Sequence, residues 1–133
     1  MVAIDIDKLL AAASRVRERA YAPYSHFAVG AAALGDDGRI YVGTNVENAS
    51  YGLSLCAERA AVAAAVAGGA AKILAVAVVA SRPVPPCGAC LQVIAELGPE
   101  AAVAWGDGAG RYEVANVGEL LTKPFRLERE GGG

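Results

Sequence analysis

The chain has 133 residues, a net charge of -2 and 55% hydrophobic residues, which suffices for one buried core and excludes intrinsic disorder. Its basic residues are scattered, so it does not present the concentrated positive face that a nucleic acid or an anionic membrane requires. The apolar runs are too short to span a bilayer, and the N-terminal segment does not resemble a secretory signal. We therefore expect one domain over residues 1–133, in the cytoplasm, with neither a nucleic acid nor a membrane as partner.

Helices and strands are predicted from apolar periodicity, and their limits from capping aspartates, glycines and prolines. In chain order, the predicted elements are a helix from Asp5 or Asp7 to about Ala20, strands over 27–34 and 39–46, a helix over 56–67, a strand over 73–80, a helix over 88–97, and strands over 101–105 and 111–117. This order predicts a three-layer α/β/α sandwich with a central mixed five-stranded sheet.

Residues 73–80 form a continuous apolar run, as in a strand that is covered on both faces. The glycine-rich segment 106–110 precedes a strand and not a helix, so we interpret it as a hairpin loop and not as a phosphate-binding loop. Residues 123–133 are expected to form a partly flexible C-terminal tail, with Gly131–Gly133 frayed.

The cysteines indicate metal chemistry. Their number is odd, at three, so a disulfide framework cannot use them all. Cys87 and Cys90 are three residues apart in the first turn of a predicted helix, which puts both sulfurs on one face. Cys56 begins another helix and can supply a third ligand if the two helix N-termini converge. Three protein ligands on Zn²⁺ leave the fourth tetrahedral position open, as in catalytic zinc sites.

Two charged residues follow the first cysteine. Glu58 lies two positions after Cys56 and is not needed as a ligand, so it is free to take a proton from water and pass it to a substrate nitrogen. Arg59 is close enough in sequence to hydrogen-bond a sulfur and withdraw charge from an electron-rich three-thiolate site. The set is complete for hydrolytic attack at an amidine-like carbon.

Other interpretations of these residues exist. Cys87 and Cys90 could form a redox pair, although this leaves the Cys56-x-Glu58 pattern unexplained. A closed structural zinc site needs a fourth ligand, for which His26 is the candidate. Glu58 and Arg59 could be an exposed charged pair, but the rest of their helix is apolar and offers little solvated surface.

Four sequence blocks together resemble a known family. They are Tyr24-Ser25-x-Phe27-x-Val29-Gly30-Ala31, Asn45-Val46-Glu47-Asn48-Ala49-Ser50-Tyr51-Gly52, Cys56-Ala57-Glu58-Arg59 and Pro86-Cys87-Gly88-Ala89-Cys90. In this order they resemble the small, homotetrameric, zinc-dependent cytidine deaminases of pyrimidine salvage, over about residues 21–125. The wider superfamily of nucleobase deaminases has a His or a Cys as first ligand, and Cys56 matches the branch that acts on free nucleosides.

The resemblance implies a role for each matching residue. Cys56, Cys87 and Cys90 would bind one Zn²⁺ per chain, and Glu58 would shuttle protons during attack of water on the pyrimidine C4. The implied substrate contacts are Asn45 and Glu47 to the ribose 3′-hydroxyl, Phe27 as an aromatic wall for the base, and the Ala57 backbone N–H to the pyrimidine carbonyl. Tyr51 and Phe125 would act across subunit interfaces of the homotetramer, with Phe125 stacking on the base in a neighbour's site.

The implied reaction is hydrolysis of cytidine and 2′-deoxycytidine to uridine and 2′-deoxyuridine with release of ammonia. This chain departs from the family pattern at Thr122-Lys123, Pro85 and Leu91, which affects the tail path and fine substrate preference. The alternatives are a related deaminase of the same fold, acting on blasticidin or on an RNA base, and a non-enzymatic zinc-stabilised binding or redox module. The Asn45-x-Glu47 block favours a nucleoside enzyme, and the scattered basic residues disfavour RNA.

Overall fold

The computed structural model describes residues 2–128. The fraying predicted for Gly131–Gly133 therefore lies outside the described residues, as does the end of the predicted flexible tail. Within the described part, a single sheet of five strands in the order β2-β1-β3-β4-β5 forms the centre of the molecule. The strands are β1 (Gly30–Gly35), β2 (Ile40–Thr44), β3 (Ile73–Val79), β4 (Ala102–Gly106) and β5 (Tyr112–Asn116).

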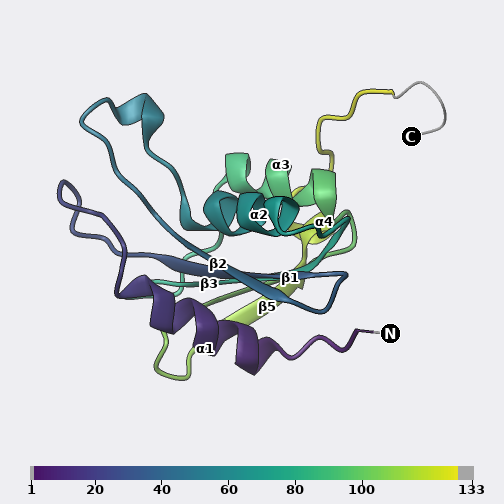
Figure 1. Ribbon diagram of the computed structural model, residues 1–133, viewed down its shortest axis with the longest axis horizontal. Coiled ribbons are helices and arrows are strands. Elements are labelled where there is room, and N and C mark those ends of the chain that lie inside the picture. The colour runs from purple at the N-terminus through teal and green to yellow at the C-terminus, as the bar shows by residue number, and fades with distance from the viewer. Residues whose placement is uncertain (1, 129–133) are drawn as a thin grey trace.

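The sheet is mixed and its two faces are covered by helices. β3 and β4 are parallel, whereas the other neighbouring strands are antiparallel. Helix α1 (Ile6–Arg17) lies on one face, and α2 (Ala57–Ala67) and α3 (Gly88–Leu97) lie side by side on the other (Figure 1). The predicted three-layer α/β/α sandwich with a mixed five-stranded sheet is confirmed.

Helix α1 begins as its sequence predicts. The Asp5 side chain accepts a hydrogen bond from the Lys8 backbone N–H at 3.1 Å, which satisfies one of the free N–H groups of the first turn. Leu9, Ala12 and Ala13 form its buried stripe. The helix ends at Arg17 and not near Ala20, because the N–H groups of Arg19 and Ala20 donate to the carbonyls three residues back, as in a tight turn, and not four residues back, as in a helix.

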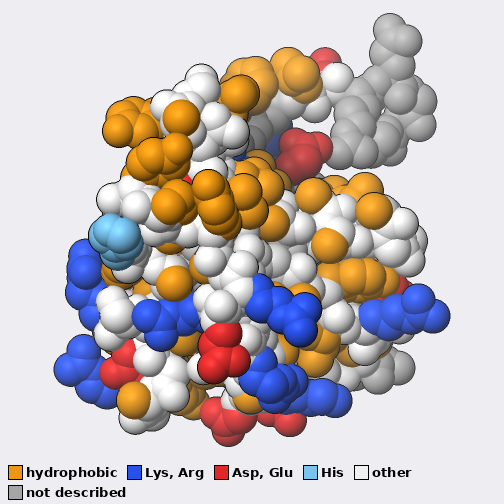
Figure 2. Space-filling view, turned by 60° about the vertical axis from the view of Figure 1, so that its left-hand side comes forward, with side chains coloured by type: hydrophobic (Ala, Val, Ile, Leu, Met, Phe, Trp, Pro, Cys, Tyr) orange, Lys and Arg blue, Asp and Glu red, His pale blue; other side chains and the backbone are white. Residues whose placement is uncertain are grey.

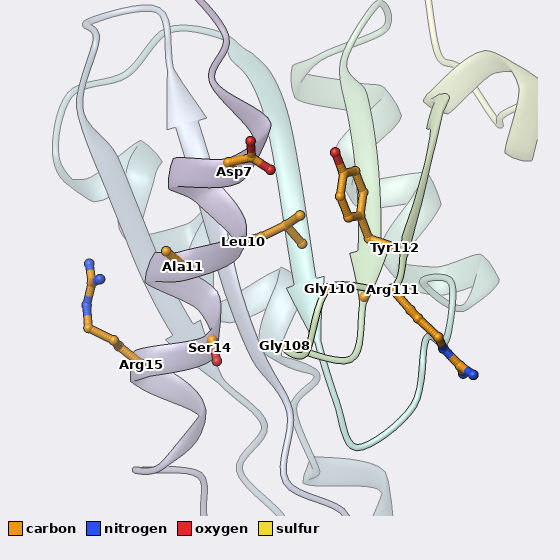
Figure 3. A pocket seen from close by; sticks show the side chains of 10 residues that line it. Asp7, Leu10, Ala11, Ser14, Arg15, Gly108, Gly110, Arg111 and Tyr112 are labelled. Carbon is orange, nitrogen blue, oxygen red and sulfur yellow. The ribbon is translucent and has the colours of Figure 1, made fainter.

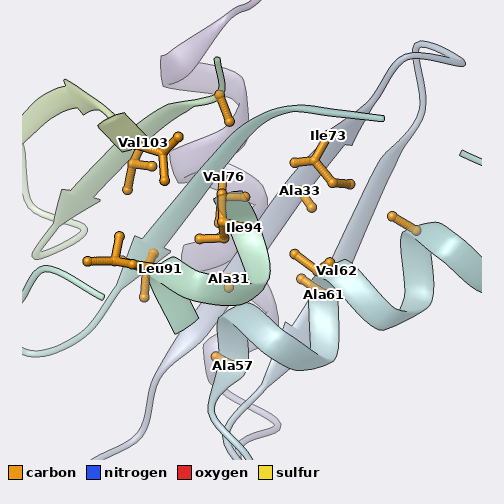
Figure 4. Close-up of a cluster of buried hydrophobic side chains, with 14 of the residues drawn as sticks. Ala31, Ala33, Ala57, Ala61, Val62, Ile73, Val76, Leu91, Ile94 and Val103 are labelled. Atoms are coloured by element: carbon orange, nitrogen blue, oxygen red, sulfur yellow. The ribbon is translucent and has the colours of Figure 1, made fainter. Parts of the chain in front are cut away.

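The larger core lies between the sheet and the pair α2 and α3. Small and branched side chains from the sheet, from α2 and from α3 pack against one another there (Figure 4): Ala31, Ala33, Ala57, Ala61, Val62, Ile73, Val76, Leu91, Ile94 and Val103. Close packing depends on Gly43 of β2, where a Cβ would lie 2.5 Å from the Ala61 N and 2.7 Å from the Ala60 Cβ. Helix α2 therefore rests directly on the strand, which fixes the position of its N-terminus.

The strand predicted over 27–34 begins only at Gly30. The backbone N–H groups of Phe27 and Val29 donate to the side chains of Ser25 and Asn45 and not to a neighbouring strand. The structure also contains two short helices that sequence patterns did not predict, a 3-10 turn over Tyr51–Leu53 and α4 (Val117–Leu120). Both are too short to show a hydrophobic period.

Several large hydrophobic side chains remain exposed, and the loop between β2 and α2 carries four of them: Val46, Tyr51, Leu53 and Leu55. Figure 2 shows a face on which hydrophobic side chains gather above a band of mixed charged side chains. Within residues 2–128, no helix combines the length and the apolar character that a bilayer span demands.

Candidate active site

Three thiols converge where two helices begin. Cys56 is the N-cap residue of α2 and Cys87 that of α3, and Cys90 lies in the first turn of α3. All three sulfur atoms lie within 4.8 Å of one another, and the Cys87 and Cys90 sulfurs are 3.6 Å apart. The structure thus brings together the three cysteines that the sequence analysis selected as metal ligands.

This cluster fits a zinc ion by its donors and its spacing. Sulfur ligands at about 2.3 Å in a tetrahedral arrangement are about 3.8 Å apart, close to the 3.6 Å that separates the Cys87 and Cys90 sulfurs. Helix N-termini favour the ionised sulfur, which is the form that binds a metal. Among the described residues, the metal-ligating side chains that cluster are the three cysteines alone, and His26 is not part of the group. The closed four-ligand site considered from the sequence is therefore not formed here.

Arg59 contacts the cluster. Its Nη2 donates to the Cys56 sulfur at 3.3 Å, the contact that the sequence spacing predicted. Hydrogen bonds from Cys90 and Arg59 lower the pKa of Cys56 to about 5. The pKa of Cys90 is raised, because its thiol donates to Cys56 and is buried. The guanidinium thus stabilises negative charge on the Cys56 sulfur, with which it is hydrogen-bonded.

Glu58 is the one charged side chain among the described residues that is buried, with 6% of its surface exposed. Burial raises the pKa of its carboxyl above the ordinary value, and the nearby Cys56 adds to the shift. A carboxyl group whose pKa is moved toward neutrality can both accept and donate a proton at physiological pH. The interpretation of Glu58 as part of an exposed charged pair is therefore wrong.

Cys56, Cys87 and Glu58 open onto a cavity of about 350 Å³, within the usual range for small-molecule pockets of about 300–1,000 Å³. The cavity lies between the start of α2, the loop before α3 and the segment that precedes β1. Its other lining residues include several that the sequence analysis assigned to substrate binding: Phe27, Asn45, Glu47 and Ala57.

Asn45 and Glu47 have partners within the chain as well as a place on the cavity wall. The Asn45 amide donates to the Phe27 carbonyl at 2.8 Å and accepts from the Val29 N–H at 2.9 Å. The Glu47 carboxylate accepts from the backbone N–H groups of Tyr24 and Ser25 and from the Ser25 hydroxyl. An amide and a carboxylate have further donor and acceptor capacity, so each can still contact a hydroxyl group in the cavity.

Tyr51 and Phe125 do not line this cavity within one chain. Tyr51 is 78% exposed and Phe125 is 69% exposed, although the position of each is defined. The Tyr51 ring meets the Tyr24 ring edge-on, with 6.3 Å between ring centroids. The Phe125 backbone is held by the Gln92 side chain of α3, which accepts from its N–H at 2.9 Å and donates to its carbonyl at 2.8 Å.

Sequence reasoning did not identify three residues that contact site residues. Ser25 lines the cavity, Arg82 lies with its guanidinium carbon 5.1 Å from the centroid of the Phe27 ring, and Gln92 holds Phe125 as described. Ser25 lies inside one of the quoted sequence blocks, and Gln92 lies two residues after the end of another. The contacts of Ser25 with Glu47 and of Gln92 with Phe125 span 22 and 33 residues of sequence, so no local pattern reveals them.

A second cavity, of about 400 Å³, lies on the α1 side of the sheet beside the glycine-rich loop between β4 and β5 (Figure 3). Asp7, Leu10 and Tyr112 line it, and Arg15 and Arg111 extend from opposite sides of it (Figure 3). The loop itself is closed by Asp107, which accepts from the backbone N–H groups of Ala109 and Arg111. Its arrangement agrees with the predicted hairpin loop, and the cavity contains none of the residues selected as a site.

Comparison with known proteins agrees with this geometry. Residues 4–105 match the family model described as the cytidine and deoxycytidylate deaminase zinc-binding region. A cytidine deaminase of Halalkalibacterium halodurans is 49% identical over 128 residues, which cover 94% of this chain and 97% of that protein.

Solved structures of cytidine deaminases have the same fold as this chain. The crystal structure of cytidine deaminase from Burkholderia pseudomallei superposes with a TM-score of 0.86 at 46% identity and covers 92% of this chain and 100% of that one. The structure of the Mycobacterium tuberculosis cytidine deaminase superposes with a TM-score of 0.81 at 44% identity, over 94% of this chain and 100% of that one. The chain belongs to the cytidine and deoxycytidylate deaminase zinc-binding family.

Proposed function

We propose that this chain hydrolyses cytidine and 2′-deoxycytidine to uridine and 2′-deoxyuridine and releases ammonia, as an enzyme of pyrimidine salvage in the cytoplasm. The observation that carries the proposal is the buried Glu58 carboxyl next to three clustered thiols, at one end of a cavity with an aromatic wall. Its relatives that bear the name cytidine deaminase support the same substrate class.

Cys56, Cys87 and Cys90 would hold one Zn²⁺ per chain, and a zinc ion with an open fourth position supplies a water whose pKa is lowered toward neutrality. Arg59 supports the site by its hydrogen bond to the Cys56 sulfur. Such a bond reduces the charge that three thiolates place on a metal and orients the ligand.

Glu58 moves the protons of the reaction. Its carboxylate accepts a proton from the attacking water and delivers it to N3 of the pyrimidine as C4 becomes tetrahedral. It then takes a second proton from the hydroxyl group now bound to C4 and transfers it to the 4-amino nitrogen, so that the C4–N bond breaks, the C4 carbonyl forms and ammonia leaves. Burial raises the pKa of this carboxyl, and a raised pKa suits a group that must gain and lose a proton in one cycle.

The remaining cavity residues hold the nucleoside. Phe27 forms the wall for the base, and the Ala57 N–H donates to the pyrimidine carbonyl from the start of α2, where backbone N–H groups have no partner within the helix. Asn45 and Glu47 bind the ribose 3′-hydroxyl with the donor and acceptor capacity that their backbone contacts leave.

We propose further that the protein is a homotetramer with its active sites at subunit interfaces. Tyr51 and Phe125 are exposed aromatic residues whose placement is supported by Tyr24 and Gln92, as expected for side chains that a neighbouring subunit receives. In this assembly Phe125 stacks on the base in a neighbour's cavity.

The function is tested by following absorbance and ammonia release with cytidine, 2′-deoxycytidine and blasticidin S as substrates. The proposal predicts turnover of both nucleosides with equimolar ammonia and little or no turnover of blasticidin S. Turnover of blasticidin S alone would refute the substrate assignment, and no ammonia from any of the three would refute deamination.

A further inference from the structure

The segment that carries Phe27 has an unusual backbone. His26 has a φ of 59°, in the left-handed region that few residues with a side chain adopt. The residues on either side of His26 do not belong to a strand, because β1 begins only at Gly30. Such a conformation persists when surrounding contacts determine it, so the contacts of this segment decide where the Phe27 ring lies.

One hydroxyl group links this segment to Glu47. The Ser25 hydroxyl donates to Glu47 Oε2, and the Ser25 Oγ accepts from the Phe27 N–H at 3.0 Å. The other oxygen of Glu47 accepts from the N–H groups of Tyr24 at 2.9 Å and Ser25 at 3.1 Å. Because the single hydrogen of the hydroxyl is used on Glu47, Ser25 has no donor left for a substrate.

Phe27 is also held at its carbonyl and at its ring. The Asn45 side-chain amide donates to the Phe27 carbonyl at 2.8 Å, and the Arg82 guanidinium carbon lies 5.1 Å from the ring centroid, within cation–π range. The N–H, the carbonyl and the ring of one residue are thus each contacted by a different side chain. The contact at the carbonyl is with Asn45 itself, and the contact at the N–H leads through Ser25 to Glu47. Asn45 and Glu47 are the residues proposed to bind the ribose.

We propose that Ser25 is a positioning residue, which holds the Phe27 wall in place for the base by linking the Phe27 backbone to the Glu47 carboxylate. This inference rests on the proposed function, because it takes Phe27 as the wall for a pyrimidine. Ser25 acts through Phe27 and makes no required contact with the nucleoside. The side chains at the ribose end of the cavity therefore also set the geometry of its base end.

A double-mutant cycle separates this role from a direct contact. Ser25→Ala removes the hydroxyl that links Phe27 to Glu47 and is expected to lower kcat/KM for cytidine about tenfold. Ser25→Thr keeps the hydroxyl and should retain most of the wild-type kcat/KM. In a Phe27→Ala background, Ser25→Ala should cost less than about twofold, because the residue through which it acts is gone. Additive losses would overturn the proposal.

Two controls test whether Ser25 acts through Phe27 and not through a contact with the ribose. Ser54 lines the same cavity, but its hydroxyl accepts from the Asn48 N–H at 3.1 Å, so Ser54→Ala should combine additively with Phe27→Ala. Turnover of 2′,3′-dideoxycytidine, which lacks the 3′-hydroxyl, should show the same Ser25→Ala loss as cytidine. If the loss disappears with this substrate, Ser25 acts through a ribose contact of Glu47 and the proposal is wrong.

Amide hydrogen exchange tests the link without turnover. In Ser25→Ala the Phe27 amide should exchange at least about tenfold faster, and Ser25→Thr should leave it protected. The Val29 amide, whose acceptor is Asn45, serves as the internal reference. An unchanged Phe27 amide would overturn the proposal. Absence of cytidine turnover in the zinc-loaded wild type would instead refute the proposed function, while exchange would still decide whether Ser25 holds Phe27.

Discussion

Gly43 lies where β2 passes beneath α2, and replacing it with alanine should displace the helix that carries Cys56 and Glu58. The new methyl group would lie 2.5 Å from the Ala61 N and 2.7 Å from the Ala60 Cβ, whereas ordinary van der Waals contact begins at 3.4 Å. Relief of the shorter contact requires a relative movement of about 1 Å. Backbone atoms cannot rotate away as a flexible side chain can, so helix and strand must separate.

The magnitude follows from two opposing effects. Overpacking of this kind costs about 1–3 kcal/mol, and replacing a strand glycine by alanine recovers roughly 0.5–1 kcal/mol of backbone entropy. The net destabilisation is therefore at most about 2.5 kcal/mol, a fall in Tm of up to roughly 10 °C for a domain of this size. Because misplacement of catalytic groups by about 1 Å can cost about 10²-fold in rate, cytidine turnover should fall further than stability alone explains.

The assay is thermal unfolding by circular dichroism, with turnover and zinc content measured on the same samples at one protein concentration. Gly118→Ala is the matched control, since a Cβ at Gly118 of α4 would meet nothing within 4 Å. This variant should be as stable as the wild type or slightly more stable. A Gly43→Ala protein with unchanged Tm and turnover would refute the close approach of α2 to β2.

Three further predictions concern the site and its surroundings. Arg59→Gln should keep zinc but lower kcat/KM about 10–100-fold, because the Cys56 sulfur loses its hydrogen bond at 3.3 Å; an unchanged kcat/KM at full zinc content would contradict this role. Gln92→Ala removes both hydrogen bonds to the Phe125 backbone and should raise KM for cytidine several-fold with a smaller change in kcat, so an unchanged KM would argue against a substrate role for Phe125. Hydrogen bonds from the Ser25 hydroxyl and from the backbone N–H groups of Ser25 and Tyr24 lower the pKa of Glu47 below its ordinary value of 4.5. The ionised Glu47 therefore stabilises the folded state above pH 4.5, and this stabilisation is lost as the pH falls through the lowered pKa. Urea unfolding of Glu47→Gln should therefore depend less steeply on pH below about 4.5, and parallel profiles would contradict this assignment.

The clustering of the three thiols was predictable because it depends on local sequence features. Cys87 and Cys90 share a helical face by spacing alone, and a helix start at Cys56 follows from the alanine-rich run behind it. Convergence of the two helix N-termini needed only that both helices cover one face of the sheet. The same locality applies to the Arg59 contact, which spans three residues along one helix.

The contacts around Phe27 were not predictable from local patterns. Asn45 reaches Phe27 across 18 residues of sequence, and Glu47 reaches Tyr24 across 23. A strand pattern that includes Phe27 predicts an earlier strand start, because hydrophobic alternation does not show that side chains have replaced strand hydrogen bonds. Short elements were missed for a related reason, since α4 comprises four residues and has no period to detect.

The central claim is that Glu58 transfers protons next to a zinc ion held by Cys56, Cys87 and Cys90, and Glu58→Gln tests it most directly. Zinc content and cytidine turnover should be measured on the same samples of wild type and variant. We expect about one zinc per chain in both proteins and a loss of turnover of at least about 10²–10⁴-fold in the variant. Wild-type turnover in a Glu58→Gln protein that retains its zinc would contradict it.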